Sequence, residues 1–196
     1  EEELSGLIER HIRGEVFFRH LIAQRKLTPV PLYLENCTPA DAEAVARRFG
    51  PHDPRLAQTL ALLGRLYTSQ ARWEEAEVTL EEALELYRTA LGPESPDVAS
   101  VLVFLGNLRR DQGRYGDAEG AYRRSLEIFE AAFGTDDASL IPVLRYLGRA
   151  SLANGDLAGA EQAYRRQGDL ISLHSGEQSM EAAGHAYNTA SFLVEV

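Results

Sequence analysis

The sequence predicts an all-α protein, an α-α superhelix built from antiparallel helical hairpins. Three observations lead to this prediction. Several residue types recur every 42 positions, apolar residues inside each 42-residue unit follow helical spacing, and glycine or proline stands where helices should end or begin. A period of this length is typical of arrays in which each unit is one hairpin that stacks on the next.

The repeat is the strongest of these observations, because five columns recur in one register. A glycine inside a helix costs about 1 kcal/mol relative to alanine, so a recurring helical glycine predicts that the second helix of the hairpin approaches closely there, opposite a column of alanines. The five columns are Gly64, Gly106 and Gly148; Leu63, Leu105 and Leu147; Leu60, Leu102 and Leu144; Ala76, Ala118 and Ala160; and Gly92, Gly134 and Gly176.

Each unit is predicted to contain two helices. In the first unit, residues 54–70 and residues 73–91 carry apolar side chains at helical spacing, separated by a short break. The next unit begins with Pro96, which suits the first position of a helix because that position needs no N–H. In the third unit the proline is replaced, and Asp136 or Asp137 is expected to cap the helix.

The two ends of the chain repeat less cleanly. A helix is expected from the N-terminus to about Ile22, and a second one between Thr38 and Gly50. Together they are interpreted as a capping or docking segment or a degenerate repeat. The predicted organisation is a helical segment at 1–51 and a repeat array at 52–196, with units at 52–94, 95–136 and 137–178 and a partial fourth unit at 179–196.

Composition limits the classes of partner and the compartment. The net charge of −10 disfavours binding to nucleic acid or to an anionic membrane, which need clustered basic residues. The single cysteine, Cys37, cannot form an intrachain disulfide, and no apolar run approaches the roughly 20 residues of a membrane span. A cytoplasmic, bacterial protein is therefore expected.

No pattern of catalytic or metal-binding residues is apparent. The sequence lacks a phosphate-binding or dinucleotide-binding glycine motif after a strand, a nucleophile elbow and a helical zinc pair, and the five histidines share no ligand spacing. Cys37 is interpreted as a small buried residue. No catalytic activity, cofactor or metal is predicted, and the acids of the second helix are expected on a solvated face, at Glu74, Glu75, Glu81, Glu82 and Glu85.

The repeat resembles a known family. The 42-residue period and the linker from Leu91 to Pro96 resemble the kinesin light chain subclass of tetratricopeptide repeats. That subclass usually carries consecutive asparagines before its Leu-Gly pair, where this chain has Ala61 and Leu62. The resemblance covers residues 52–196, and the residues of the first unit that match the tetratricopeptide consensus are Leu63, Gly64, Tyr67, Ala76, Leu80 and Ala83.

The resemblance implies a right-handed superhelix that binds a peptide or partner protein on an inner face lined by the first helix of each hairpin. Carried across the units, the register places basic and aromatic groups on this face. A ligand with acidic and apolar side chains is therefore expected. The candidate partner-binding residues are Arg65, Phe104, Asn107, Arg110, Arg145, Tyr146, Arg149 and Tyr187.

Three alternatives stay open. The aromatic residues could pack between repeats while the arginines pair with neighbouring acids. The chain could instead be a structural module that self-associates or stacks through an open C-terminal end, as the apolar run at 192–194 indicates. An enzyme would require the first 51 residues to complete a site with the array.

Overall fold

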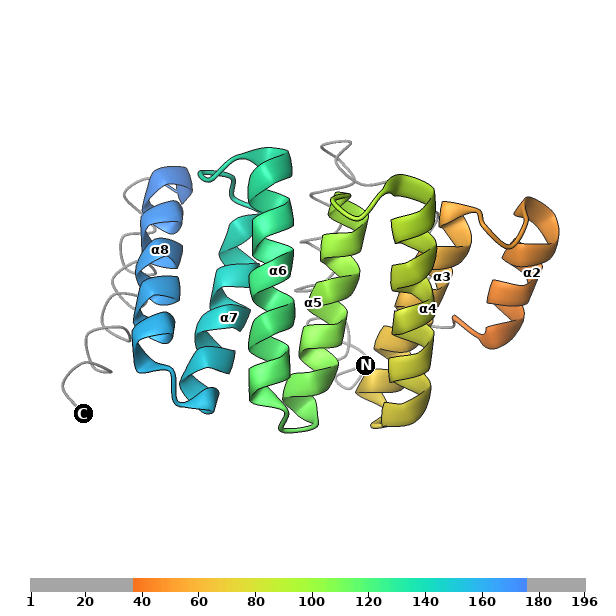
Figure 1. The fold of residues 1–196 in the computed structure, drawn as a ribbon, viewed down its shortest axis with the longest axis horizontal. Coiled ribbons are helices and arrows are strands. Elements are labelled where there is room, and N and C mark those ends of the chain that lie inside the picture. The colour runs from red at the N-terminus through yellow and green to blue at the C-terminus, as the bar shows by residue number, and fades with distance from the viewer. Residues whose placement is uncertain (1–36, 176–196) are drawn as a thin grey trace, which may run out of the picture. The chain divides into compact units, whose positions relative to one another are not determined.

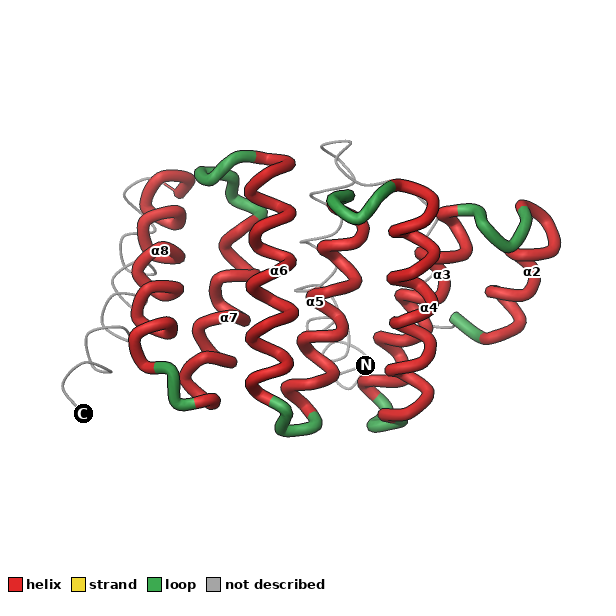
Figure 2. Tube along the Cα trace, in the orientation of Figure 1, coloured by secondary structure: helices red, strands yellow, loops and turns green. Residues whose placement is uncertain are grey.

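A computed structural model of the chain describes residues 37–175, all of which lie in one compact unit. Within these residues the chain forms seven α-helices joined by short loops, with no strand (Figure 2). The predicted all-α class is confirmed. The helices are α2 (Pro39–Phe49), α3 (Pro54–Ser69), α4 (Trp73–Leu91), α5 (Pro96–Asp111), α6 (Tyr115–Phe133), α7 (Leu140–Asn154) and α8 (Leu157–Ser175).

The helices after α2 form three consecutive hairpins, in which α3 packs against α4, α5 against α6 and α7 against α8. The second helices, α4, α6 and α8, follow one another across the front of Figure 1, and α3, α5 and α7 lie behind them. The second helices begin at Trp73, Tyr115 and Leu157, which are 42 residues apart. The predicted helical hairpin is therefore the repeating unit.

The glycine column marks a close approach of two helices, as predicted, but the neighbouring side chain is not an alanine. A Cβ added to Gly106 would lie 2.5 Å from Cε1 of Tyr122, and one added to Gly64 would lie 2.5 Å from Cγ of Leu80. Tyr122 and Leu80 each follow the alanine column by four residues. Helical side chains point back toward the N-terminus and cover the preceding turn, so they reach the glycine from one turn further along.

The starts of the first helices show what proline contributes. Asp53 and Ser95 each accept a backbone N–H of the first turn, and a proline follows each of them. The third unit lacks this proline, and α7 begins at Leu140, two residues later than the register predicts. Asp137, one of the two expected caps, accepts the backbone N–H of Ser139 at 2.8 Å, before the helix proper.

Glycines end the helices where the sequence predicts. Gly92 has φ 89° and ψ 158°, and Gly134 has φ 91° and ψ 164°, a backbone region that is essentially restricted to glycine. Gly50 ends α2 in the same way, and Thr38 stands immediately before the first residue of this helix. The helix predicted between Thr38 and Gly50 is therefore confirmed.

Several predictions fall on residues that the structure does not describe. The helix expected up to Ile22, the partial unit at 179–196, the apolar run at 192–194 and Tyr187 all lie outside residues 37–175. The division at residue 51 stays a prediction. No helix within the described residues is long and apolar enough to cross a bilayer.

Candidate functional site

The seven described candidates, Arg65, Phe104, Asn107, Arg110, Arg145, Tyr146 and Arg149, define the inner face. On α3 and α5 it contains a cation–π pair: Cζ of Arg65 lies 5.1 Å from the centre of the Phe104 ring, within the range of such contacts. Phe104 is only 7% exposed, whereas Arg65 is half-buried. The Phe104 ring therefore packs inside the fold.

A hydrogen-bonded cluster joins α5 to α6. Oδ1 of Asn107 accepts a hydrogen bond from the Tyr122 hydroxyl at 2.8 Å and another from Nη1 of Arg110 at 3.1 Å. Arg110 also donates to Oδ1 of Asp111 through Nε at 3.0 Å and Nη2 at 2.8 Å. Asn107 thus connects Arg110 of its own helix to a tyrosine from the other helix of the hairpin.

The same tyrosine extends the cluster to α7. The rings of Tyr122 and Tyr146 stack with centroids 5.7 Å apart and an interplanar angle of 28°, a favourable offset geometry for aromatic pairs. Burial raises the pKa of the Tyr122 phenol above its ordinary value, although the Arg110 charge opposes this effect. The hydroxyl therefore stays protonated and acts as a donor to Asn107.

Two arginines on α7 complete the site. Arg145 and Arg149 are both exposed and lie four residues apart, on one side of the helix. Cζ of Arg145 lies 5.4 Å from the centre of the Tyr146 ring. Burial raises the pKa of Tyr164 on α8, and the charge of Arg149 opposes that shift.

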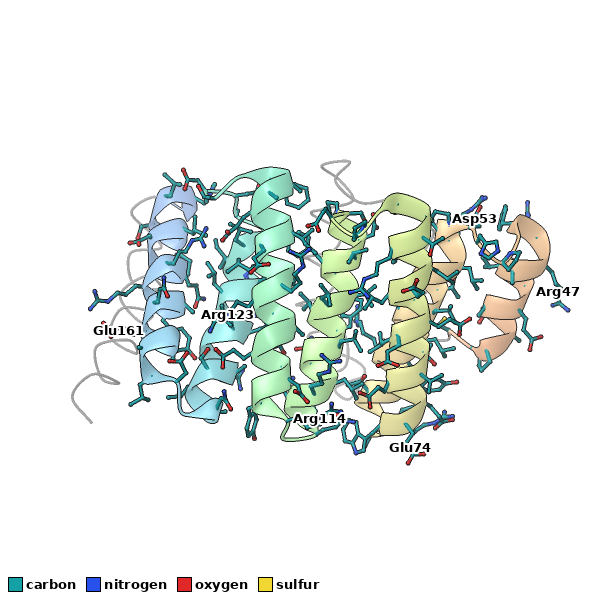
Figure 3. The ribbon with its side chains drawn as sticks, viewed as in Figure 1. Arg47, Asp53, Glu74, Arg114, Arg123 and Glu161 are labelled. Atoms are coloured by element: carbon teal, nitrogen blue, oxygen red, sulfur yellow. The ribbon has the colours of Figure 1, made fainter. Side chains whose placement is uncertain are left out.

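Most other arginines in the described part of the chain are paired with carboxylates. Arg114 bridges to Glu77 of the preceding repeat at 3.1 Å, and Arg124 bridges to Glu94 at 2.5 Å. Figure 3 shows Arg114 at the lower end of α5 and α6, and Arg123 between α6 and α7. The arginines with such pairs are Arg55, Arg72, Arg110, Arg114, Arg123, Arg124, Arg165 and Arg166.

Within residues 37–175, Arg145 and Arg149 form no ion pair with a carboxylate. Arg110 pairs with Asp111, as the alternative of arginines paired with neighbouring acids expects, whereas Arg145 and Arg149 have no such pair among the described residues. The acids predicted on a solvated face of α4 are all exposed, which confirms that prediction; they are Glu74, Glu75, Glu81, Glu82 and Glu85.

Tyr122 and Tyr164 were missed by the sequence analysis, which assigned the inner face to the first helix of each hairpin alone. Both residues stand four positions after the alanine column, where the first repeat has Leu80. Tyrosine in a buried column carries a hydroxyl that needs a partner. This change from leucine to tyrosine was the available signal.

Residues with metal-binding or nucleophilic chemistry do not cluster in the described chain. Among residues 37–175, no group of three or more His, Cys, Asp and Glu side chains could hold a metal ion. Cys37 is half-buried rather than fully buried, and its thiol donates to the carbonyl oxygen of Thr59 at 3.6 Å. Burial, with a contribution from the Asp41 charge, raises the pKa of this thiol, so the thiolate nucleophile is disfavoured.

Comparison with curated proteins finds short matches. The chain is 55% identical over 38 residues to isocitrate dehydrogenase kinase/phosphatase of Rhodopseudomonas palustris strain HaA2, covering 19% of this chain and 6% of that protein. The protein of the same name from strain TIE-1 is 53% identical over 55 residues, covering 25% and 9%. The chain thus spans less than a tenth of the length of these relatives, and their activity is not carried over to it.

Solved structures share the fold. A putative kinesin light chain protein of Podosopora anserina with nearly identical TPR-like repeats has a TM-score of 0.70 at 17% identity, covering 94% of this chain and 87% of that one. BtubC (BKLC) from P. vanneervenii has a TM-score of 0.64 at 23% identity, covering 80% and 67%.

Family models give the same result from the sequence. One tetratricopeptide repeat model matches residues 56–97, and a second matches residues 97–166. Both describe the same repeat, and together they cover more than half of the 196 residues. The chain therefore belongs to the tetratricopeptide repeat proteins, and its fold is that of the kinesin light chain-like repeats.

Proposed function

We propose that this chain is a non-catalytic, cytoplasmic adaptor whose inner face binds a peptide or a segment of a partner protein that carries acidic and apolar side chains. The repeat family and fold are those of protein-interaction scaffolds in general. The acidic character of the ligand is our inference from the side chains of α5 and α7.

The observation that carries this proposal is the charge of Arg145 and Arg149. The chain has 30 acidic and 20 basic residues, and eight described arginines have a carboxylate partner, whereas these two exposed arginines have none among residues 37–175. The exposed arginines of α2 and α4, Arg47, Arg48 and Arg88, also lack such a pair within the described residues, but only Arg145 and Arg149 lie four residues apart on a helix predicted to line the inner face. A guanidinium binds a carboxylate through two parallel hydrogen bonds. Two such groups on one side of α7 therefore favour an acidic partner.

Charge alone gives modest affinity. An exposed ion pair contributes about 0.2 to 1 kcal/mol, so two arginines together change the dissociation constant by roughly two- to thirtyfold. Tyr146 stacks on the buried Tyr122 ring, lies 5.4 Å from Cζ of Arg145 and is half-buried, so it offers part of an aromatic face to an apolar side chain. Binding should weaken with salt without disappearing.

The test compares two labelled peptides, Asp-Leu-Asp-Phe-Asp-Leu and its isosteric counterpart Asn-Leu-Asn-Phe-Asn-Leu, by fluorescence anisotropy at 50 and 300 mM salt. Between these concentrations the Debye length falls from about 14 Å to about 6 Å. The wild type should bind the aspartate peptide more tightly, and the double variant Arg145→Glu, Arg149→Glu should lose that preference and its salt dependence.

The matched control is Arg47→Glu with Arg88→Glu, which changes the net charge equally at two exposed arginines on α2 and α4. It should retain most of the preference for the aspartate peptide. If the wild type does not distinguish the two peptides, or if the control loses as much affinity as the inner-face variant, the inner face is not an acidic-peptide site.

A further inference from the structure

An asparagine side chain connects the second and third repeats. Asn154, the last residue of α7, donates a hydrogen bond from Nδ2 to Oε2 of Glu119 on α6 at 3.0 Å. Glu119 is only 8% exposed, so its carboxylate needs hydrogen-bond partners within the fold. The other oxygen of this carboxylate accepts a hydrogen bond from Arg123. The asparagine amide therefore satisfies one oxygen of a buried acid in the neighbouring repeat.

The preceding junction, between the first and second repeats, uses a different residue for the same purpose. Glu77 stands one repeat before Glu119, and it pairs with Arg114 at 3.1 Å. In the third repeat the position of Arg114 is occupied by Asp156, and an ionised aspartate has no proton to donate to another carboxylate. Asn154 supplies the donor instead, so the second junction depends on an amide where the first depends on an arginine.

The residue after Asn154 makes this amide chemically reactive. Gly155 has φ 86° and ψ 5°, both residues are exposed, and nothing lies within 4 Å of a Cβ added to the glycine. The backbone nitrogen of Gly155 can attack Cγ of Asn154 and close a succinimide ring. The Cγ–Nδ2 bond breaks, and Nδ2 leaves as ammonia with the proton of the Gly155 N–H. Water then opens the ring to aspartate or isoaspartate.

Two hydrogen bonds restrain the reacting groups in the folded chain. Nδ2 of Asn154 is bonded to Glu119, and the N–H of Gly155 donates to the carbonyl oxygen of Leu152 at 3.1 Å. The reaction therefore requires the end of α7 to open, as helix ends do readily. The carboxylate formed at position 154 would face the buried carboxylate of Glu119, and like charges in a poorly solvated place repel. The modified junction therefore closes less readily.

We propose that Asn154 is a site of spontaneous deamidation, and that the product loosens the third repeat from the second in one irreversible step. Water is the only co-reactant. The inference concerns the array itself and does not depend on what the inner face binds. Because α7 also carries Arg145 and Arg149, a loosened junction changes how these arginines are placed relative to α5.

Ageing the whole chain at mildly alkaline pH tests the modification, with peptide mapping by mass spectrometry. The peptide that contains Asn154 should gain the mass of an NH2-to-OH exchange, as a mixture of aspartate and isoaspartate, and Asn154→Gln should abolish this change. Gln112 is the internal control, since it stands one repeat earlier and also precedes a glycine with positive φ, Gly113 at 77°. Its longer side chain must close a larger ring. If the Asn154 peptide changes no faster than the Gln112 peptide, the proposal is wrong.

Asn154→Asp tests the loosening, because it introduces the aspartate product directly. The midpoint of thermal unfolding should fall by about 3 °C or more, since a hydrogen bond to a charged group is replaced by a repulsion. Amide exchange should become faster in α7 and α8 and stay unchanged in α3 and α4. The rescue variant combines Glu119→Gln with Asn154→Asp, so that an amide again donates to a carboxylate. It should recover most of the lost midpoint.

Gln112→Glu is the matched control for charge. It adds the same unit of negative charge one repeat earlier, where Arg114 lies 3.3 Å from the Gln112 side-chain oxygen, and the midpoint should stay nearly unchanged or rise. If Asn154→Asp has no larger effect than Gln112→Glu, the product does not loosen the junction. If the exchanged pair is as unstable as Asn154→Asp alone, the effect does not act through Glu119, and the inference fails.

Discussion

The close approach at Gly106 can be tested with Gly→Ala substitutions. The same substitution should lower the stability of the fold at one glycine and raise it at another. Alanine is favoured over glycine inside a helix by about 1 kcal/mol, so Gly→Ala stabilises wherever there is room. A Cβ at position 106 would lie 2.5, 2.8 and 2.9 Å from three ring atoms of Tyr122, against an ordinary carbon–carbon contact of about 3.5 to 4.0 Å.

The expected magnitudes follow from these distances. Overpacking a core costs roughly 1 to 3 kcal/mol, and the fully buried Tyr122 ring cannot move aside without disturbing its contacts with Asn107 and Tyr146. Because three ring atoms lie within 3.0 Å, the cost should fall in the upper part of this range, about 2 to 3 kcal/mol, and Gly106→Ala should destabilise the protein by roughly 1 to 2 kcal/mol after the helical gain of about 1 kcal/mol. At Gly148 the shortest distance is 3.0 Å, so the two effects should nearly cancel.

Gly120 supplies the control, because nothing lies within 4 Å of a Cβ added there and the residue is exposed on α6. Gly120→Ala should stabilise by about 1 kcal/mol. Circular dichroism during thermal unfolding should rank the variants Gly120→Ala, Gly148→Ala and Gly106→Ala from most to least stable, with about 2 to 4 °C per kcal/mol. Equal midpoints for Gly106→Ala and Gly120→Ala would show that Tyr122 does not fill this space.

Two further predictions concern buried hydroxyls and pH. Ser125 is fully buried and donates to the Ala99 carbonyl oxygen at 2.8 Å, whereas the buried hydroxyl of Ser151 has no hydrogen-bond partner among residues 37–175. Ser125→Ala should therefore cost about 1 kcal/mol, and Ser151→Ala should be neutral or stabilising in the same unfolding assay. The hydrogen bond and charge of Arg55 lower the pKa of Asp53 to about 2. The stabilising contribution of the Asp53 carboxylate is therefore present above pH 4 and lost as the pH falls toward 2. Asp53→Asn should flatten the pH dependence of the unfolding midpoint in that interval. An unchanged profile would contradict this role of Asp53.

The hairpin architecture could be predicted because it depends on local rules that the sequence repeats. Spacing, caps and terminal glycines all recur in register, and the second helices begin 42 residues apart. The start of α7 differs because a proline fixes the first helical position in the other units and Leu140 follows a turn instead. The first residue of a helix can be predicted from the preceding unit only where the residue that fixes that position recurs.

The candidate site was only partly predictable. Periodicity assigns a residue to a side of its own helix, so Arg145 and Arg149 could be placed together on α7. It does not show how far a side chain of the second helix reaches past the first, which depends on the missing Cβ of a glycine and the length of the side chain opposite. The pairing of Tyr122 with Asn107 needed the three-dimensional structure.

In the second repeat the glycine column affects both the packing of the hairpin and the hydrogen bonding of a side chain on the first helix. In the first repeat the space beside Gly64 is filled by Leu80, and the glycine serves packing alone. In the second, the longer Tyr122 fills the space beside Gly106 and also donates a hydrogen bond to Asn107. A repeat array keeps one backbone for all units, so differences in recognition between units must come from side chains. The column that packs the hairpins is one of the places where the side chains of the units differ, with Leu80 in the first repeat and Tyr122 in the second.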